Sequence, residues 1–168
     1  MSKAALKFNF KAKNGIAYLV QAGLCTKEPK KPEEDKFEDP AEYAKAKETY
    51  DTDYMIHKKG FVKFLKTAPT LDKTAVGEFF GKISASYNMD VLDVYLNEYD
   101  FTGVFYVNAL KMMLSGFRLL GEGQIVDKMM EKFGEKFAAD NPNGGPNKMN
   151  REMSAEALYL VSYATMML

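Results

Sequence analysis

The sequence contains very little of the residue types that build disulfides, zinc sites and catalytic triads. Among 168 residues it has one cysteine, Cys25, one histidine, His57, and no tryptophan. A single cysteine excludes a disulfide framework and a zinc site with several cysteines, and it fits a reducing compartment. We expect Cys25 to be a small buried apolar residue and His57, in a charged segment, to be solvated. Neither covalent catalysis nor a metal or cofactor of its own is therefore indicated.

An excess of one charge and a long apolar run are also absent. The chain has 23 Lys and Arg against 23 Asp and Glu, so its formal net charge is zero. Because nucleic-acid-binding domains normally carry a basic excess, nucleic acid is disfavoured as a partner. No stretch reaches the roughly 18 apolar residues that span a bilayer, and the first residues lack the apolar core of a secretory signal. We expect a soluble, cytoplasmic protein.

Helical periodicity is the dominant pattern. Apolar residues recur three and four positions apart in successive segments, and no segment shows the alternation of a strand bounded by turns. The length suits one domain. We therefore predict an all-α fold of about seven or eight helices with short connections. The residues expected on buried helix faces are Ile16, Leu19, Val20, Leu24, Phe61, Phe64, Leu65, Leu71, Ala75, Phe79, Ile83, Leu92, Tyr95, Leu96, Val107, Leu110, Met113, Leu114, Val126, Met129, Met130, Phe133 and Phe137.

Residues 26–59 differ in composition from the rest of the chain. They combine three prolines with mixed charge and almost no aliphatic residues, a composition that buries little apolar surface. We interpret them as a charged surface insertion with a helix over residues 40–50. A separate short helix that carries Phe61, Phe64 and Leu65 should follow and be closed by Pro69.

Local signals also predict where the chain turns and where helices begin. Asn14-Gly15 is a turn dipeptide. Thr70 is the expected N-cap of the next helix, with Asp72 in its first turn, and Asn88 is the expected N-cap of the helix after that. Asp100–Gly103 should form a turn.

The segment FRLLGEGQIVDKMM, residues 117–130, places Glu122 between Gly121 and Gly123. Gly is roughly 1 kcal/mol less favourable than Ala inside a helix. Taken alone, Glu122 reads as a helix-start carboxylate, stabilised by about 0.3–1 kcal/mol through the helix dipole. The segment is not a phosphate-binding glycine loop, because no strand precedes it and no lysine-hydroxyl pair follows. The acidic residues expected only to be solvated are Glu131, Glu135 and Asp140.

Several segments together resemble the Sec-seven (Sec7) domain, the exchange-factor module that acts on Arf GTPases. The family's first signature is matched identically by Phe117, Arg118, Leu119, Gly121, Glu122, Gln124 and Asp127, with Lys128 conservative. Other family elements resemble residues 8–19, 71–81, 99–119 and 157–168, in family order. The resemblance implies one domain over residues 1–168, lacking the family's later helices, with residues 26–59 inserted.

The resemblance implies an all-α right-handed superhelix and an activity, the release of GDP from an Arf-family GTPase. Glu122 corresponds to the family's glutamate finger. Gly121, Gln124, Asp127 and Lys128 are expected to contact the GTPase. A final helix, capped by Ser154, is expected to be buried and to line a groove for the GTPase's apolar switch residues. The groove residues are Tyr159, Tyr163, Met166 and Met167.

Electrostatics explains how one carboxylate could expel a nucleotide. Two like charges ~4 Å apart at an effective dielectric near 20 repel by about 4 kcal/mol, a factor near a thousand in affinity. Flanking glycines would leave room for Glu122 to project into the site that holds phosphate and Mg²⁺. GDP, GTP and Mg²⁺ would belong to the partner GTPase. Peripheral recruitment to Golgi, endosomal or plasma membranes would use regions outside this chain.

Three substitutions depart from the family pattern and keep other interpretations open. Leu120 replaces a proline, Gly123 replaces an alanine, and Ile125 replaces a lysine that would contact the GTPase. One alternative is a degenerate or truncated module that binds GDP-bound Arf without exchange. Another is a helical scaffold with no GTPase contact, in which the groove residues pack against the domain itself.

Overall fold

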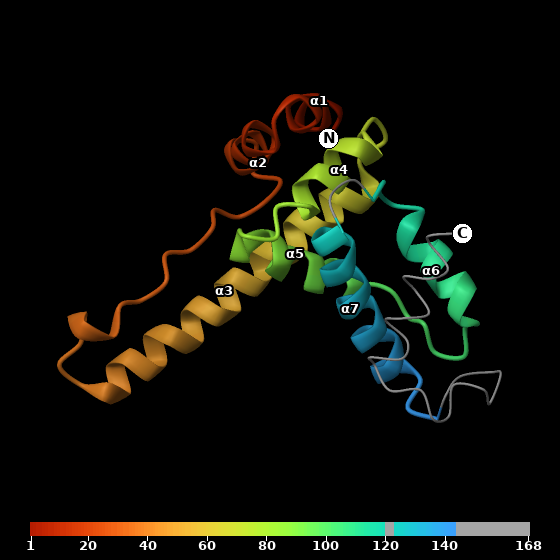
Figure 1. The fold of residues 1–168 in the computed structure, drawn as a ribbon. Helices are drawn as coiled ribbons and strands as arrows, with labels where there is room; N and C mark the ends of the chain where they lie inside the picture. Colours follow the sequence, from red (N-terminus) through yellow and green to blue (C-terminus); the bar gives the residue numbers. More distant parts are fainter. Residues whose placement is uncertain (120–122, 144–168) are drawn as a thin grey trace. The chain divides into compact units, whose positions relative to one another are not determined.

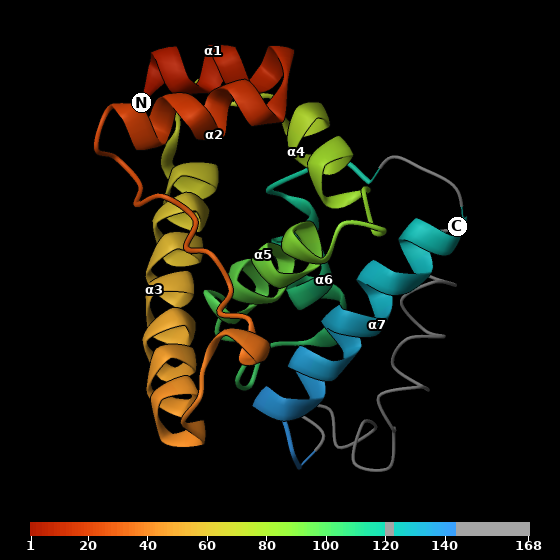
Figure 2. The same ribbon diagram turned by 90° about the vertical axis from the view of Figure 1, so that its left-hand side faces the viewer.

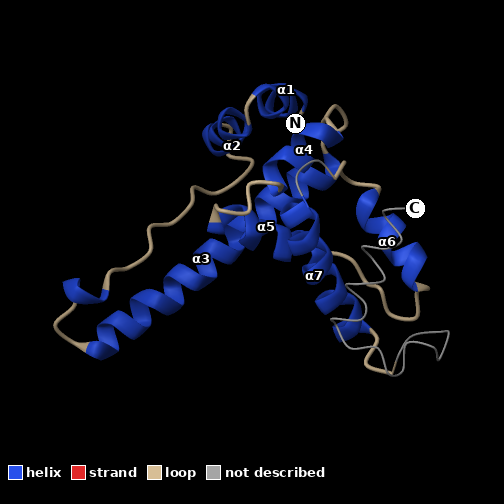
Figure 3. Ribbon diagram, in the orientation of Figure 1, coloured by secondary structure: helices blue, strands red, loops and turns tan. Residues whose placement is uncertain are grey.

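The computed structural model describes residues 1–119 and 123–143 (Figure 1). Within these ranges it has seven α-helices, one short 3₁₀ helix and no strand. Figure 3 colours the described chain as helix and loop alone. The all-α prediction is confirmed. None of the described helices is long and apolar enough to cross a bilayer. The chain divides into two compact units, Met1–Thr70 and the residues from Leu71 on, which are described separately.

The first unit begins with two antiparallel helices, α1 (Ser2–Phe10) and α2 (Ala12–Gln21). They lie side by side in both views (Figures 1 and 2). The chain reverses at Lys11, whose φ of −159° is extended, so the turn predicted at Asn14-Gly15 is wrong. Gly15 instead lies inside α2, where a Cβ would come within 2.4 Å of Phe8 Cβ. The glycine permits close helix packing rather than a turn.

A single long helix, α3 (Pro40–Thr67), follows a segment that contains the 3₁₀ helix η1 (Glu34–Lys36). Asp39 caps α3 by accepting a hydrogen bond from Ala41 N at 2.8 Å, and Pro40 stands at the first helical position, where its missing N–H costs nothing. The helix predicted over residues 40–50 and the separate helix predicted through Phe61, Phe64 and Leu65 are therefore one continuous helix. Its carboxyl-terminal part packs in the core through Phe61, Phe64 and Leu65.

His57 is buried, with 1% of its surface exposed, so the prediction of a solvated histidine is wrong. Its Nδ1 lies 2.6 Å from the carbonyl oxygen of Thr26. Cys25, predicted to be buried, donates from Sγ to the His57 carbonyl at 3.3 Å, and Sγ lies 3.6 Å from Nδ1. Burial raises the pKa of the Cys25 thiol above its usual value of 9.0. These contacts fix the chain after α2 against α3.

The second unit contains α4 (Lys73–Phe80), α5 (Ser86–Asn97), α6 (Tyr106–Leu114) and α7 (Gly123–Asp140). Asp72, not Thr70, is the N-cap of α4, since its carboxylate accepts from Thr74 N at 2.9 Å. Asn88 is not a cap either. It is buried inside α5, and its Nδ2 donates to the Phe79 carbonyl at 2.5 Å.

Most of the predicted helix faces are confirmed. The turn at Asp100–Gly103 is also confirmed, with Gly103 at a φ of 69°. The prediction that Leu24 and Val107 are buried is wrong, since each side chain is 45% exposed. The predicted face residues that the structure buries are Leu19, Phe61, Phe64, Leu65, Phe79, Leu92, Tyr95, Leu96, Leu110, Met113, Met129, Met130, Phe133 and Phe137. The predicted final helix over residues 154–168 lies outside the described residues.

Candidate functional site

The candidate site is the segment that leads from α6 into α7, where the sequence places Glu122. Phe117, five positions earlier, is 1% exposed. Its ring centroid lies 5.2 Å from that of Phe80 on α4 and 6.0 Å from that of Tyr95 on α5, both edge to face. Such geometries add about 0.5–1.5 kcal/mol to area burial. The first residue of the matched signature is therefore an anchor in the core of the second unit.

The backbone of the same segment is fixed against α4. Arg118 N donates to the Lys73 carbonyl at 3.0 Å. A Cβ at Gly77 would lie 1.8 Å from the carbonyl oxygen of Arg118. A Cβ at Gly116 would lie 1.9 Å from the Tyr95 hydroxyl oxygen. Hydrogen in place of a side chain at these two glycines is what lets the segment approach the helices so closely.

Sequence reasoning missed the roles of Gly77 and Gly116. A glycine within a predicted helix costs roughly 1 kcal/mol and usually has a packing reason, so Gly77 carried a usable signal. Its partner, the Arg118 carbonyl, lies 41 positions away and no periodicity identifies it.

The first turns of α7 carry polar residues on the exposed side of the helix and buried methionines on the other side. Gln124 and Lys128 are exposed and Asp127 is half-buried, whereas Met129 and Met130 are buried. Lys128 Nζ donates to Glu131 Oε2 at 2.6 Å, and this hydrogen bond raises the pKa of Lys128. The signature residues Gln124, Asp127 and Lys128 thus share the first turns of one helix. Gly121 and Glu122, and the groove residues Tyr159, Tyr163, Met166 and Met167, lie outside the described residues.

The rest of α7 is held by contacts to α5 and to the turn after it. Lys132 Nζ lies 2.5 Å from Asp93 Oδ1 on α5. Asp140, predicted to be merely solvated, is half-buried and accepts from Phe101 N at 2.9 Å, so that prediction is wrong. The Asn141 side chain accepts from Gly103 N at 2.9 Å and donates to the Phe101 carbonyl at 2.9 Å. These bonds fix the carboxyl-terminal end of α7.

Aromatic rings connect the anchored segment to α7. Tyr95 contacts Tyr99, Tyr99 stacks on Phe101 at 5.5 Å, and Phe101 meets Phe133 edge to face at 5.5 Å. The Tyr99 hydroxyl donates to the Tyr95 hydroxyl oxygen at 3.1 Å. The residues just before and just after positions 120–122 therefore belong to one packed body.

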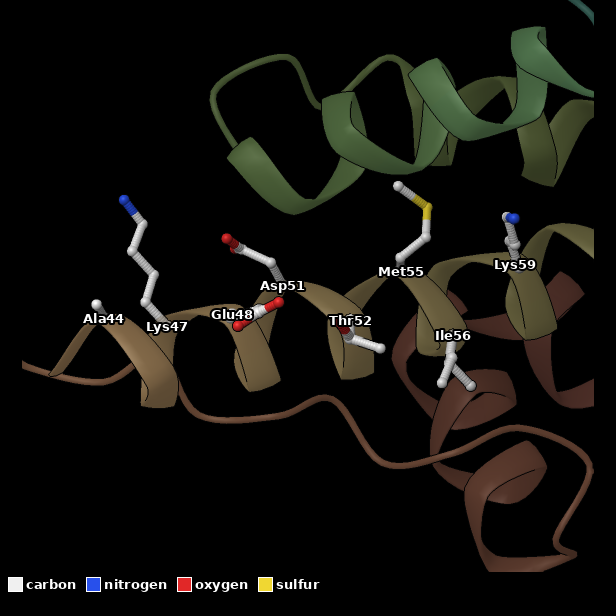
Figure 4. Close-up of a pocket in the computed structure, with 8 residues that line it drawn as sticks. All are labelled: Ala44, Lys47, Glu48, Asp51, Thr52, Met55, Ile56 and Lys59. Carbon is white, nitrogen blue, oxygen red and sulfur yellow. The ribbon is translucent and has the colours of Figure 1, made fainter. Parts of the chain in front are cut away.

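A second concave feature is a hollow on α3. It is lined by Ala44, Lys47, Glu48, Asp51, Thr52, Met55, Ile56 and Lys59. Figure 4 shows that these side chains are spread along one helix and do not converge on a point. Among the described residues there is no cluster of three or more His, Cys, Asp or Glu side chains that could hold a metal ion. The side chains that line the hollow therefore do not form a catalytic or metal-binding arrangement.

The comparisons with known proteins identify the family. The fold is that of the Sec7p catalytic domain, with a TM-score of 0.74 and 28% identity over 99% of this chain and 69% of that one. The chain matches the Sec7 domain family over residues 1–168, so it belongs to that family.

Two curated relatives carry exchange-factor names. Brefeldin A-inhibited guanine nucleotide-exchange protein 1 of Homo sapiens is 32% identical over 161 residues, 96% of this chain and 7% of the relative. The ADP-ribosylation factor guanine nucleotide-exchange factor SEC7 of Saccharomyces cerevisiae is 38% identical over 123 residues, 68% of this chain and 6% of the relative. The chain thus spans less than a tenth of the length of these relatives. A Sec7 domain solved with ARF1-GDP and brefeldin A shares the fold, with a TM-score of 0.69 and 21% identity over 99% of this chain and 66% of that one.

Proposed function

We propose that this protein promotes the release of GDP from an Arf-family small GTPase, with Glu122 as the displacing carboxylate. The observation that carries the proposal is the place of Glu122 in a Sec7-family chain. It stands between Gly121 and Gly123, immediately before α7 and shortly after a segment anchored in the core. The exchange-factor names of the relatives support the activity.

The anchoring of the flanking segments supports the role of Glu122. A carboxylate that must enter another protein's phosphate site works only if its own protein holds it there, because freedom to retreat would relieve the repulsion. Phe117 and Arg118 before it and Met129 and Met130 after it are tied to the packed body of the second unit. Reduced freedom on both sides lowers the entropic cost of presenting the charge.

The charges of the first turns of α7 support a polar contact with the GTPase. Gln124 and Lys128 are exposed, and Asp127, between them in sequence, is half-buried. We propose that these residues bind the switch region while Gly121 gives the loop room. Tyr159, Tyr163, Met166 and Met167 would form the apolar groove, since methionine adapts to irregular partner surfaces.

We propose further that the protein needs no cofactor or metal of its own, because nucleotide and Mg²⁺ would be bound by the GTPase. Vesicle trafficking is the process that fits such an activity. The site of action would be the cytoplasmic face of Golgi, endosomal or plasma membranes.

Nucleotide release from an Arf protein loaded with a fluorescent GDP analogue tests the proposal. Glu122→Gln, which removes only the charge, should slow the accelerated release by up to about a thousandfold, since removing a repulsion of about 4 kcal/mol has that effect. Glu122→Lys, which places a cation beside the phosphate, should slow the release at least as much. Glu135→Lys is the matched control, because Glu135 is exposed further along α7, and it should release at the wild-type rate.

Equal rates for wild type and Glu122→Lys would overturn the role of Glu122. A wild-type chain that forms a stable complex with GDP-bound Arf without accelerating release would instead establish a binding module. That alternative is favoured by Leu120 and Ile125, which replace the family's proline and lysine.

A further inference from the structure

The exposed face of α1 combines two large apolar side chains with two lysines. Lys3, Leu6, Lys7 and Phe10 stand at positions i, i+3, i+4 and i+7, so they share one face of the helix. Leu6 is 65% exposed and Phe10 is 87% exposed. An apolar pair so exposed on a helix is unusual unless another surface covers it.

The face of Leu6 and Phe10 is not the one on which α1 packs. The opposite face carries Ala4, Ala5 and Phe8, each at most 1% exposed. Phe8 lies against Gly15 of α2 and meets the Phe61 and Phe64 rings of α3 at 6.0 and 5.9 Å. One face of α1 thus packs in the core of the first unit, and the face that carries Leu6 and Phe10 is available to a partner.

The charge around this face is uniformly positive. Residues 1–21 contain four lysines and no acidic residue, although the whole chain has equal numbers of acidic and basic residues. Lys3 and Lys7 each place Nζ 5.7 Å from the Tyr18 ring centroid, and Lys11 and Lys13 follow as exposed residues. The positive charge is therefore local to α1 and α2, which lie beside one another in Figures 1 and 2.

We propose that α1 lies flat on an anionic lipid surface, with Leu6 and Phe10 inserted between headgroups and the lysines against the lipid phosphates. An amphipathic helix with a basic polar flank has the composition of an in-plane membrane helix. Nine residues are far too few to span a bilayer. This surface lies in the first unit and does not depend on the proposed exchange activity.

The basic residues beside the exposed face of α1 are lysines, which favours a lipid surface over an acidic protein as the partner of that face. Protein interfaces are enriched in arginine and depleted of lysine. All four basic residues within residues 1–21 are lysines, in a chain that contains only two arginines. Lysine is a flexible point charge that suits a diffuse layer of phosphates, whereas arginine suits fixed bidentate pairing. One short helix gives weak, reversible binding, to which each lysine near the surface contributes about fivefold.

Sedimentation with vesicles tests the proposal on the 168-residue chain. It should bind vesicles that contain phosphatidylserine and not vesicles of phosphatidylcholine alone, and the binding should weaken with salt. Lys3→Gln/Lys7→Gln should weaken the partition by about ten- to thirtyfold. Lys45→Gln/Lys47→Gln, which removes the same charge from exposed positions of α3, should bind as wild type.

A second pair of double variants tests the contribution of the apolar side chains to vesicle binding. Leu6→Gln/Phe10→Gln should weaken the partition by about tenfold or more, since it removes the inserted apolar surface. Glutamine is a good helix former, so α1 is expected to survive, and circular dichroism checks this. Met55→Gln/Ile56→Gln, at exposed apolar positions of α3, should leave binding unchanged.

The absence of tryptophan allows a direct test of insertion. Phe10→Trp creates a single-tryptophan protein whose emission should shift to the blue and be quenched by brominated lipid when phosphatidylserine vesicles are added. Ile56→Trp should show neither change. Wild type that fails to bind anionic vesicles, or equal losses for the α1 and α3 lysine pairs, would overturn the proposal. The first outcome would leave an acidic protein as the occupant.

The exchange assay in solution keeps this proposal separate from the previous one. Without vesicles, Lys3→Gln/Lys7→Gln should release nucleotide at the wild-type rate. Vesicle binding that persists in Glu122→Lys would show that the lipid surface and the carboxylate are independent.

Discussion

Gly77 is the residue on which the position of the anchored segment most directly depends. Gly77→Ala would bring a methyl group to 1.8 Å from the Arg118 carbonyl oxygen, a backbone atom that cannot rotate away. We expect the free energy of unfolding to fall by about 2 kcal/mol, as in other overpacked sites. Urea denaturation measures this change.

Gly123→Ala is the matched control for that substitution. No atom of the described residues lies within 4 Å of a Cβ at Gly123. Stability should therefore stay constant or rise by up to about 1 kcal/mol, because alanine is the better helix former. Equal stability of Gly77→Ala and wild type would contradict the close approach.

The residue scale is also where sequence reasoning was weakest. Glu122 could be singled out because its flanking glycines and its match to the family signature are local features. His57 could not be placed, because its burial depends on the Thr26 carbonyl 31 positions earlier. Asp140 was likewise misjudged, since the Phe101 amide that it accepts from is 39 positions away. Periodicity describes the face of a helix, not the partner that covers it.

At the scale of elements, the end of α7 and the turn before α6 form one hydrogen-bonded unit. Asn141 is buried, and its side chain bonds to the backbone of Phe101, Gly103 and Phe137. Asn141→Ala removes all three of these bonds. It leaves Gly103 N without its acceptor, whereas the Phe101 and Phe137 carbonyls still accept from Val104 N and Asn141 N. We expect a loss of about 2–3 kcal/mol, measured by chemical denaturation.

Asn143 offers the same substitution in a different environment. It is exposed, two positions later, and Asn143→Ala should change stability by less than about 0.5 kcal/mol. If both alanine variants unfold at the same denaturant concentration, the Asn141 bonds contribute nothing measurable.

Helix existence was predictable at this scale, whereas helix boundaries were only partly so. The buried faces of α5 and α7 followed from spacing alone, since Leu92, Tyr95 and Leu96 and then Met129 and Phe133 recur at helical intervals. The charged composition of residues 40–59 hid the continuity of α3, because an exposed helical half needs no apolar stripe. The start of α4 was predicted two residues too early, because Thr70 and Asp72 are both good N-cap residues and the sequence alone does not decide between them.

At the scale of the whole molecule, buried neutral acids predict how stability depends on pH. Burial raises the pKa of Cys25 above 9.0 and of Tyr95, Tyr99 and Tyr106 above 10.0, so the folded protein keeps these groups protonated. The unfolded chain releases their protons at the ordinary values. Stability from these groups is therefore full below about pH 9 and is lost as the pH rises further.

Urea denaturation at pH 7, 9 and 10.5 measures this alkaline loss. Tyr106→Phe should make the decline above pH 10 shallower, because it removes one of the linked groups. Absorbance at 295 nm should show buried phenols ionising together with unfolding. A free energy of unfolding that stays level up to pH 11 would contradict the prediction.

The division of the chain into two units joined at Thr70 and Leu71 has a kinetic consequence. The proposed lipid-binding face belongs to the first unit and Glu122 to the second, so one covalent link joins them. A protein held at a membrane by α1 would search for its partner in two dimensions, at a local concentration set by that tether. The rate of encounter could then change with lipid composition while every contact at the carboxylate stays the same.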